Sequence, residues 1–262
     1  MRSCHFVAIL LGVLAFSRLA SADPTPSAAP QIVLLKLDDV VAANRPPGPV
    51  SPRWLRITNY LQTNHIKASF GVICESLEKD NPAYFQWLKD IQSGGLIELW
   101  MHGYHLKKAD EPGEFDHGTV DKQRAILEKG EALAKAKLGF PLAAFGEHWS
   151  AVTDATDEAV QAVPDIKIWL YGPKQPKFFH RLSLPRVMGL ENPTFVPDAV
   201  KFKDAYEKYG GKQPFLVLQG HPDQWVEDQR WEGFLAIIEY LKSKQVVFMT
   251  PSEYLQKVQP NL

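Results

Sequence analysis

Short, continuously apolar runs recur along the chain from Gln31 onward, and stretches with helical periodicity separate most of them. The apolar runs are rich in Val, Ile, Leu and Phe, which is typical of strands that are covered on both faces. We therefore expect strands at residues 32–37, 68–73, 96–101, 142–145, 166–171, 182–187, 215–218 and 246–249.

Apolar positions at helical spacing, with proline near the start or glycine after the end, predict helices between these strands. Alternation of strand and helix throughout one domain favours a parallel sheet. Seven or eight such units in this length fit a closed or nearly closed barrel, so the predicted fold is α/β, a single-domain, deformed (β/α)7-8 TIM-like barrel. The expected helices are residues 52–65, 82–91, 119–138, 154–162, 198–209, 229–243 and 252–258.

The first residues have the pattern of a secretory signal peptide. Arg2 precedes an apolar segment over residues 6–16, and Ala20-Ser21-Ala22 supplies small residues at a cleavage position before Asp23. The apolar segment is shorter than the ~20 residues that a membrane-spanning helix needs. We expect a signal peptide at residues 1–22, a Pro-rich linker at residues 23–30, the barrel domain at residues 31–262, and a secreted or periplasmic protein.

Charge and cysteine content exclude several partner classes. Removal of residues 1–22 takes away two of the 29 basic residues and no acidic one, so 27 basic residues remain against 30 acidic residues, a net charge of −3. This is too near neutral for a nucleic-acid partner or, after cleavage, a membrane partner. Cys74 is then the only cysteine, and its apolar surroundings predict a buried, unreactive thiol. The sequence carries no signal for the oligomeric state.

Polar clusters follow four of the predicted strands at the point where each strand ends. The carboxyl ends of parallel strands in a closed barrel converge on one face, where such barrels keep their chemistry. Residues far apart in sequence could therefore form one site. The clusters are Asp38-Asp39, His102 to His105, Glu147-His148 and Gln219 to His221.

Asp38 and Asp39 close the first predicted strand. Adjacent carboxylates at such a position are costly unless they bind a cation, accept hydrogen bonds or titrate. Their side chains point different ways, so one can bind a metal while the other faces the substrate as a base. Taken alone, the pair is more typical of a turn or a helix N-cap.

His102 and His105 follow the third predicted strand, with Gly103 allowing a tight backbone path between them. Two imidazoles a few residues apart at a strand end suit zinc or a similar divalent ion, although a pair of polar loop histidines has the same pattern. Asp39 offers a third ligand, and this set leaves coordination positions open for water and substrate.

His221 lies just beyond the strand at residues 215–218. Histidine titrates near neutral pH, so it can protonate a leaving group at the rim of a site, whereas a lone histidine after a strand is often structural. Three aromatic residues near the same strand ends could form a surface on which a sugar stacks, although aromatic residues usually belong to a core. They are Trp149, Tyr171 and Trp225.

These motifs resemble the polysaccharide deacetylases of the NodB-homology type, and the resemblance extends over nearly the whole mature sequence. The family implies a deformed barrel of seven β/α units, a divalent metal such as zinc, and removal of acetyl groups from N- or O-acetylated sugars. Asp38-Asp39 matches the first motif, which implies Asp38 as catalytic base and Asp39 as metal ligand. His102 matches the second motif, and residues 218–225 resemble the fifth, which implies His221 as general acid.

The sequence departs from the family pattern in its second and third motifs. The family places its two metal histidines four residues apart, whereas His102 and His105 are three apart, so either His105 or His148 completes the metal shell. The third motif, which begins at Phe145-Gly146, lacks the family's arginine, which tunes the catalytic aspartate, and its proline-aromatic pair. Glu147 in this motif is an additional candidate for contact with the substrate, as an extra base or as a solvated loop acid.

The resemblance implies a secreted, metal-dependent hydrolase that removes acetyl groups from an acetylated carbohydrate substrate. One alternative is a catalytically degenerate carbohydrate-binding protein on the same barrel, and failure to bind metal would favour it. Another is a metal-dependent amidase or glycan hydrolase, which product analysis would separate from a deacetylase.

Overall fold

The computed structural model describes residues 1, 29–43, 48–108 and 110–260. Apart from Met1, the predicted signal peptide lies outside the described residues, as does most of the predicted linker. Among the helices of the described part, none is long and apolar enough to cross a membrane.

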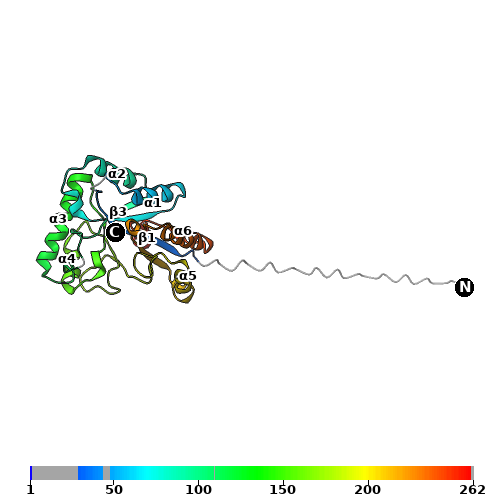
Figure 1. Ribbon diagram of the computed structural model, residues 1–262. Helices are drawn as coiled ribbons and strands as arrows, with labels where there is room; N and C mark the ends of the chain where they lie inside the picture. Colours follow the sequence, from blue (N-terminus) through cyan, green and yellow to red (C-terminus); the bar gives the residue numbers. More distant parts are fainter. Residues whose placement is uncertain (2–28, 44–47, 109, 261–262) are drawn as a thin grey trace.

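A curled parallel sheet forms the centre of the protein, and helices pack around its outside (Figure 1). The strand order is β6-β5-β4-β3-β2-β1-β7, and β8 pairs with the start of β1. All eight strands predicted from the apolar runs are present, with differences of a few residues at their ends. They are β1 (Ile32–Val40), β2 (Ala68–Val72), β3 (Ile97–Met101), β4 (Ala144–Phe145), β5 (Ile168–Leu170), β6 (Leu182–Leu184), β7 (Phe215–Gly220) and β8 (Val247–Phe248).

The seven predicted helices are also present, and local sequence signals fix several of their ends. The side chains of Ser51 and Asn81 cap α1 and α2, each of which has proline in its first turn. Gly139 ends α3 in the left-handed conformation, with φ 92°. The helices are α1 (Pro52–Thr63), α2 (Pro82–Ser93), α3 (Val120–Leu138), α4 (Asp154–Ala162), α5 (Ala199–Lys208), α6 (Asp228–Ser243) and α7 (Pro251–Val258).

The barrel is deformed because the two outer strands of the curled sheet, β6 and β7, do not pair with each other in the described part of the chain. The connection between them passes beside β7 instead, where the backbone N–H of Leu190 donates to the carbonyl of Gln219 at 2.9 Å. The deformed (β/α)7-8 barrel predicted from the sequence is thus confirmed. The irregular connection brings residues 188–191 to the carboxyl end of β7.

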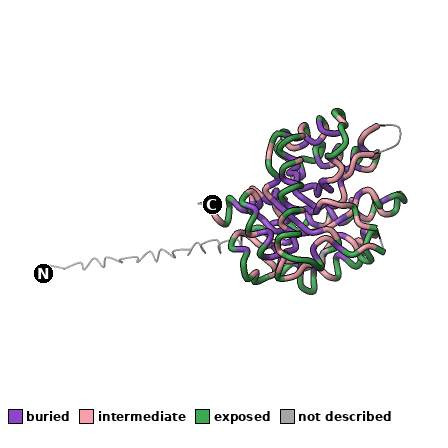
Figure 2. The backbone as a smooth tube through the Cα atoms, turned by 90° about the vertical axis from the view of Figure 1, so that its left-hand side faces the viewer, coloured by how far each residue is buried: buried purple, intermediate pink, exposed green. Residues whose placement is uncertain are grey.

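Side chains along β1 alternate between two separate apolar cores. Val33, Leu35 and Leu37 belong to the larger core, which lies between the sheet and the surrounding helices. Ile32 and Leu34 belong to a smaller core inside the curled sheet, to which α7 contributes as well. Figure 2 shows the buried strands at the centre and exposed segments at the periphery. The inner core ends along β1 where the inward-facing residues become polar.

A buried carboxyl group on α3 gives the fold a pH-dependent weakness. Glu131 accepts a hydrogen bond from the backbone N–H of Leu142 at 3.2 Å, while its Oε2 is buried with no hydrogen-bond partner among the described residues. Burial raises the pKa of Glu131 from 4.5 to about 7. The folded protein therefore holds this proton more tightly than the unfolded chain, and stability falls as pH rises through that window.

We expect Glu131→Gln, which imitates the protonated acid, to stabilise the protein by about 1–3 kcal/mol at pH 8 and by much less at pH 4.5. Urea unfolding at both pH values would measure the difference. A gain of equal size at the two pH values would contradict the titration of Glu131.

Candidate active site

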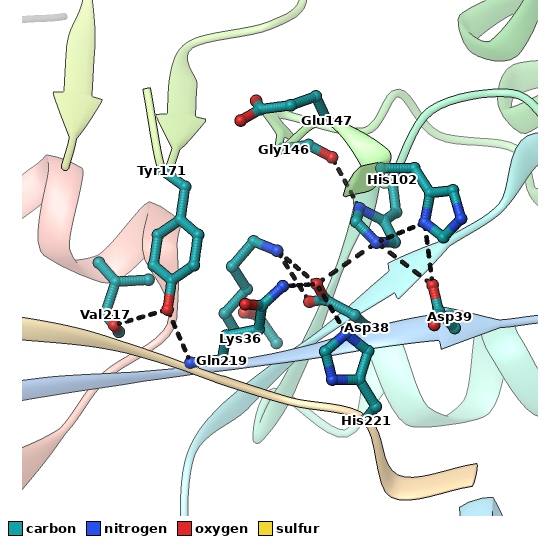
Figure 3. A network of polar contacts seen from close by, with 12 residues as sticks. Lys36, Asp38, Asp39, His102, Gly146, Glu147, Tyr171, Val217, Gln219 and His221 are labelled. Atoms are coloured by element: carbon teal, nitrogen blue, oxygen red, sulfur yellow. Dashed lines mark hydrogen bonds and ion pairs between the residues drawn. The ribbon is translucent and has the colours of Figure 1, made fainter. Parts of the chain in front are cut away.

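A lysine and an aspartate continue the inward-facing row of β1 at its carboxyl end. Lys36 and Asp38 follow Ile32 and Leu34 at the same two-residue spacing, so their side chains enter the barrel. The Lys36 ammonium donates to both oxygens of Asp38, at 2.8 and 2.7 Å, and both side chains are at most 1% exposed. The ion pair is visible at the centre of Figure 3.

A β-bulge explains how the next residue reaches the same site. In a regular strand Asp39 would point to the opposite face from Asp38, but the pairing of β1 with β2 shifts register between Leu37 and Val40. Asp39 has a φ of 73°, a left-handed conformation that is uncommon for a residue other than glycine. This distortion places the Asp39 carboxylate beside the histidines that follow β3 and β4.

Asp39, His102 and His148 come together as a compact set of ligand atoms. Asp39 Oδ1 lies 3.3 Å from His102 Nε2 and 3.2 Å from His148 Nδ1, and the two ring nitrogens are 3.3 Å apart. Three ligands of a tetrahedral zinc ion, at bond lengths of about 2.1 Å, stand roughly 3.4 Å apart. The three atoms therefore have the spacing of one face of such a coordination shell.

The hydrogen bonds around this set also fit a divalent cation. The Nδ1 of His102 lies 2.7 Å from the carbonyl oxygen of Gly146, to which it donates as the protonated ring nitrogen, so that Nε2 presents its lone pair toward Asp39. Asp39 Oδ1 is buried without a hydrogen-bond partner among the described residues. Burial would raise the pKa of Asp39, but the imidazoles of His102 and His148 beside it bring the pKa well below its usual range.

His105, the other candidate ligand, lies in a different environment. Its Nδ1 is 2.6 Å from a carboxylate oxygen of Glu75 and its Nε2 is 3.2 Å from one of Glu111, and its side chain is 45% exposed. Both ring nitrogens are thus engaged with acids, and the glutamates raise the pKa of His105, with the Glu75 hydrogen bond as the largest cause. Of the two histidines that could complete the set, the structure places His148 beside Asp39 and His102.

Asp38 is completely buried beside the candidate ligand set. Burial by itself would raise its pKa, but the Lys36 ammonium, followed by His102 and His221, brings the pKa below its usual value. The Gln219 amide also donates to Asp38 Oδ2 at 2.6 Å. Asp38 is therefore an ionised carboxylate held by cationic and polar donors. The sequence signal for Lys36 was its position in an otherwise apolar strand, two residues before Asp38.

His221 faces the same carboxylate from the end of β7. Its Nε2 lies 3.9 Å from Asp38 Oδ2, while its Nδ1 lies 2.7 Å from Glu191 Oε2 and its backbone N–H donates to Glu191 Oε1. Burial would lower the pKa of His221, but the hydrogen bond with Glu191 and the charge of Asp38 raise it above its usual value. Glu191 has no strand or motif around it, so the sequence offered no signal for its role.

A cavity of about 590 Å³ opens above these groups. Two aromatic side chains line it, Trp149 at 53% and Phe195 at 39% exposure. Both have a left-handed φ of 71°, the same unusual conformation as Asp39, and such backbone strain commonly gathers at functional sites. The ring of Phe195 meets the ring of His221 edge to face, with centroids 4.9 Å apart.

The three other predicted substrate contacts lie outside the lining of this cavity. Glu147 accepts a hydrogen bond from the Trp169 indole, burial raises its pKa to about 7, and its side chain is directed away from Asp38 in Figure 3. The Tyr171 hydroxyl accepts from the backbone N–H of Gln219 and holds the end of β7. The Trp225 indole donates to Glu191 and its ring is buried. Of the four candidates, Trp149 lies at the cavity.

We expect a protein of residues 23–262 to bind about one divalent ion per chain and His148→Ala to abolish that binding, because one of three candidate ligands is lost. Elemental analysis after equilibration with zinc would measure it. His105→Ala is the matched control, since it removes an imidazole whose partners are Glu75 and Glu111. Loss of the ion in the control and its retention in His148→Ala would assign the ligand to His105.

Neither a family model nor a curated protein sequence matches this chain. Solved structures do resemble it in fold. A family 4 acetyl xylan esterase from Clostridium thermocellum, solved with a cobalt ion, has a TM-score of 0.59 at 16% identity, over 88% of this chain and 92% of that one. A CE4 family pseudoenzyme from Bacillus anthracis has a TM-score of 0.59 at 14% identity, over 86% of this chain and 66% of that one.

An allantoinase structure is similar over more of the chain. Its TM-score is 0.66 at 14% identity, and the match covers 92% of this chain and 96% of that chain. At these identities the likeness concerns the backbone, and the roles of individual side chains must come from the geometry of this site. The resemblance noted in the sequence is thus confirmed as a shared fold: the chain has the deformed barrel of the CE4 deacetylases and of allantoinase.

Proposed function

We propose that this protein is a metal-dependent deacetylase that releases acetate from an acetylated carbohydrate. The observation that carries the proposal is the juxtaposition of a three-ligand set, Asp39, His102 and His148, with an ionised aspartate and a histidine on its flank. The solved structures of similar fold include an acetyl xylan esterase and a peptidoglycan N-acetylglucosamine deacetylase, which agrees with this reaction class.

Asp39, His102 and His148 would hold the ion, and a mixed oxygen and nitrogen donor set suits zinc. When bound, the ion would polarise the acetyl carbonyl and lower the pKa of a water molecule. Three protein ligands would leave a coordination position for water and substrate, as in catalytic rather than structural zinc sites. The N-terminal sequence pattern supports a secreted or periplasmic location for this activity.

The residues beside the ligand set have complementary roles in proton transfer. Asp38 accepts the proton of the attacking water, and its Oδ2 lies 3.3 Å from the Nε2 of His102 and 3.9 Å from that of His221. The proton on His221 Nε2 passes to the leaving amine or alkoxide, while Glu191 holds Nδ1 and stabilises the imidazolium. The exposed ring of Trp149 offers a face against which the sugar packs.

Acetate release from acetylated xylan, chitin oligosaccharides and peptidoglycan, measured on the zinc-loaded mature protein, tests the proposal. We expect His221→Ala to lower kcat by about 10²–10⁴-fold, because the general acid is lost. His65→Ala is a matched control, since His65 lies in the turn after α1 and does not line the cavity. Binding of the glycans without release of any product would indicate a carbohydrate-binding protein, and cleaved chains without acetate a glycan hydrolase.

The Asp38 variant needs a compensating change. Asp38→Asn alone leaves the Lys36 ammonium in a nearly dry interior without its counter-ion, which destabilises a fold by about 3–5 kcal/mol. The double variant Lys36→Met, Asp38→Asn removes both charges, so loss of acetate release in this variant reports on the reaction rather than on unfolding.

We expect Glu191→Gln to shift the alkaline limb of the kcat/KM profile to lower pH. Glu191 raises the pKa of His221, so without the carboxylate the general acid loses its proton at lower pH. Rates measured between pH 5 and pH 9 would show the shift. Glu191→Asp, which keeps a carboxylate, should return the alkaline limb most of the way to its position in the unaltered protein. A uniform fall in rate at every pH would mean that Glu191 only supports the structure.

A further inference from the structure

Two positive side chains line the cavity without a carboxylate partner in the described part of the chain. They are Lys107, from the loop after β3, and Arg186, from the loop after β6. Neither forms an ion pair within 4.0 Å of a described acidic group, although the full chain has 30 acidic residues against 29 basic ones. Their convergence from segments 79 positions apart concentrates positive charge at one opening.

Lys107 is held in place by contacts other than an ion pair. Its ammonium lies 3.6 Å from the centroid of the Trp149 ring and donates to the carbonyl of Lys108 at 3.1 Å. Two of its three N–H donors have no other described acceptor, so they are free for a ligand in the cavity. The contact with Trp149 also fixes the charge beside the ring that is proposed to receive the sugar.

Arg186 is likewise positioned by an aromatic ring rather than by an acid. Its guanidinium lies 5.2 Å from the centroid of the buried Tyr171 ring, and the residue is exposed. No hydrogen bond from the guanidinium to a described residue is present. A planar guanidinium with free donors matches the geometry of a carboxylate, which it can bind through two parallel hydrogen bonds.

The acids near the cavity do not cancel these charges. Asp38 is paired with Lys36, and Glu191 is paired with His221. Asp39 faces His102 and His148, where its charge would balance part of a bound cation. Among the described residues that line the cavity, Lys107 and Arg186 stand against one acid, Asp39, and the acids of the Lys107 loop, such as Asp116, lie outside the lining.

We propose that the substrate is an anionic glycan whose acetylated sugar, or its direct neighbour, carries a carboxylate that Arg186 and Lys107 bind. A hexuronate residue has this chemistry. That the bound glycan is also a substrate rests on the proposed deacetylase function. The binding preference for a carboxylated saccharide follows from the charges at the opening and can be measured without turnover.

The test compares a galacturonate trisaccharide with its carboxyl-reduced counterpart, neither of which is acetylated. Isothermal titration calorimetry on the mature protein, loaded with zinc, measures both affinities. We expect the carboxylated form to bind at least tenfold more tightly. The preference should shrink at high salt, because Arg186 and Lys107 are partly exposed to solvent. Equal affinity of the two saccharides would overturn the proposal.

Charge variants separate the proposed contacts from attraction to the metal. Arg186→Gln and Lys107→Met should each reduce the preference for the carboxylated form at least severalfold while the zinc content stays unchanged. Arg124→Gln, on the surface of α3, and Lys108→Met, next to Lys107, remove the same charges away from the cavity lining and should leave the preference intact. A preference that survives in Arg186→Gln and Lys107→Met would overturn the assignment.

Acetylated forms of the same saccharide pair then distinguish the two proposals. Faster acetate release from the carboxylated member supports both. Equal release from the two members supports a deacetylase and overturns the charge preference. A carboxylate preference in calorimetry, lost in Arg186→Gln, without acetate release from any substrate supports the binding inference and overturns the deacetylase function.

Discussion

The buried ion pair between Lys36 and Asp38 is the interaction on which the rest of the site depends. Both side chains lie inside the barrel with at most 1% exposure, where an unpaired charge would cost several kcal/mol. Paired, they provide an ionised carboxylate at a fixed point beside the proposed metal ligands Asp39, His102 and His148. His102, from the end of β3, and His221 and the Gln219 amide, both from the end of β7, are then arranged around Asp38 Oδ2.

Lys36 also accounts for a departure from the resembled family. The third motif of this chain lacks the arginine that tunes the catalytic aspartate in that family, and the strand that carries this motif supplies no other cation. Here the cation comes from β1 itself, two residues before Asp38, and lies over the rings of Trp100 and Tyr171 at 4.5 and 5.0 Å. The altered third motif therefore does not leave Asp38 without a counter-charge, which is consistent with a working site.

The secondary structure could be predicted from the sequence because apolar runs and helical periodicity are local signals. Asp39 and His102 could be placed at the site because each follows a strand, and strand ends converge in a barrel. Spacing alone could not decide whether His105 or His148 completes the candidate metal site, since the choice depends on the paths of the loops after β3 and β4. Glu191 was missed because it reaches His221 through an irregular connection that covers the gap between β6 and β7.

The predicted aromatic surface shows the same limit. Trp149, Tyr171 and Trp225 follow strands in the same way, yet Trp149 alone of these three lines the cavity. The Tyr171 hydroxyl accepts a hydrogen bond from the backbone of Gln219 at the end of β7. The Trp225 indole donates to Glu191, the partner of His221. Both rings are buried with these contacts. The Trp149 indole has no hydrogen-bond partner among the described residues, and its ring lies outward beside Lys107. An aromatic residue at a strand end is thus available to a ligand where its polar atom has no internal hydrogen-bond partner.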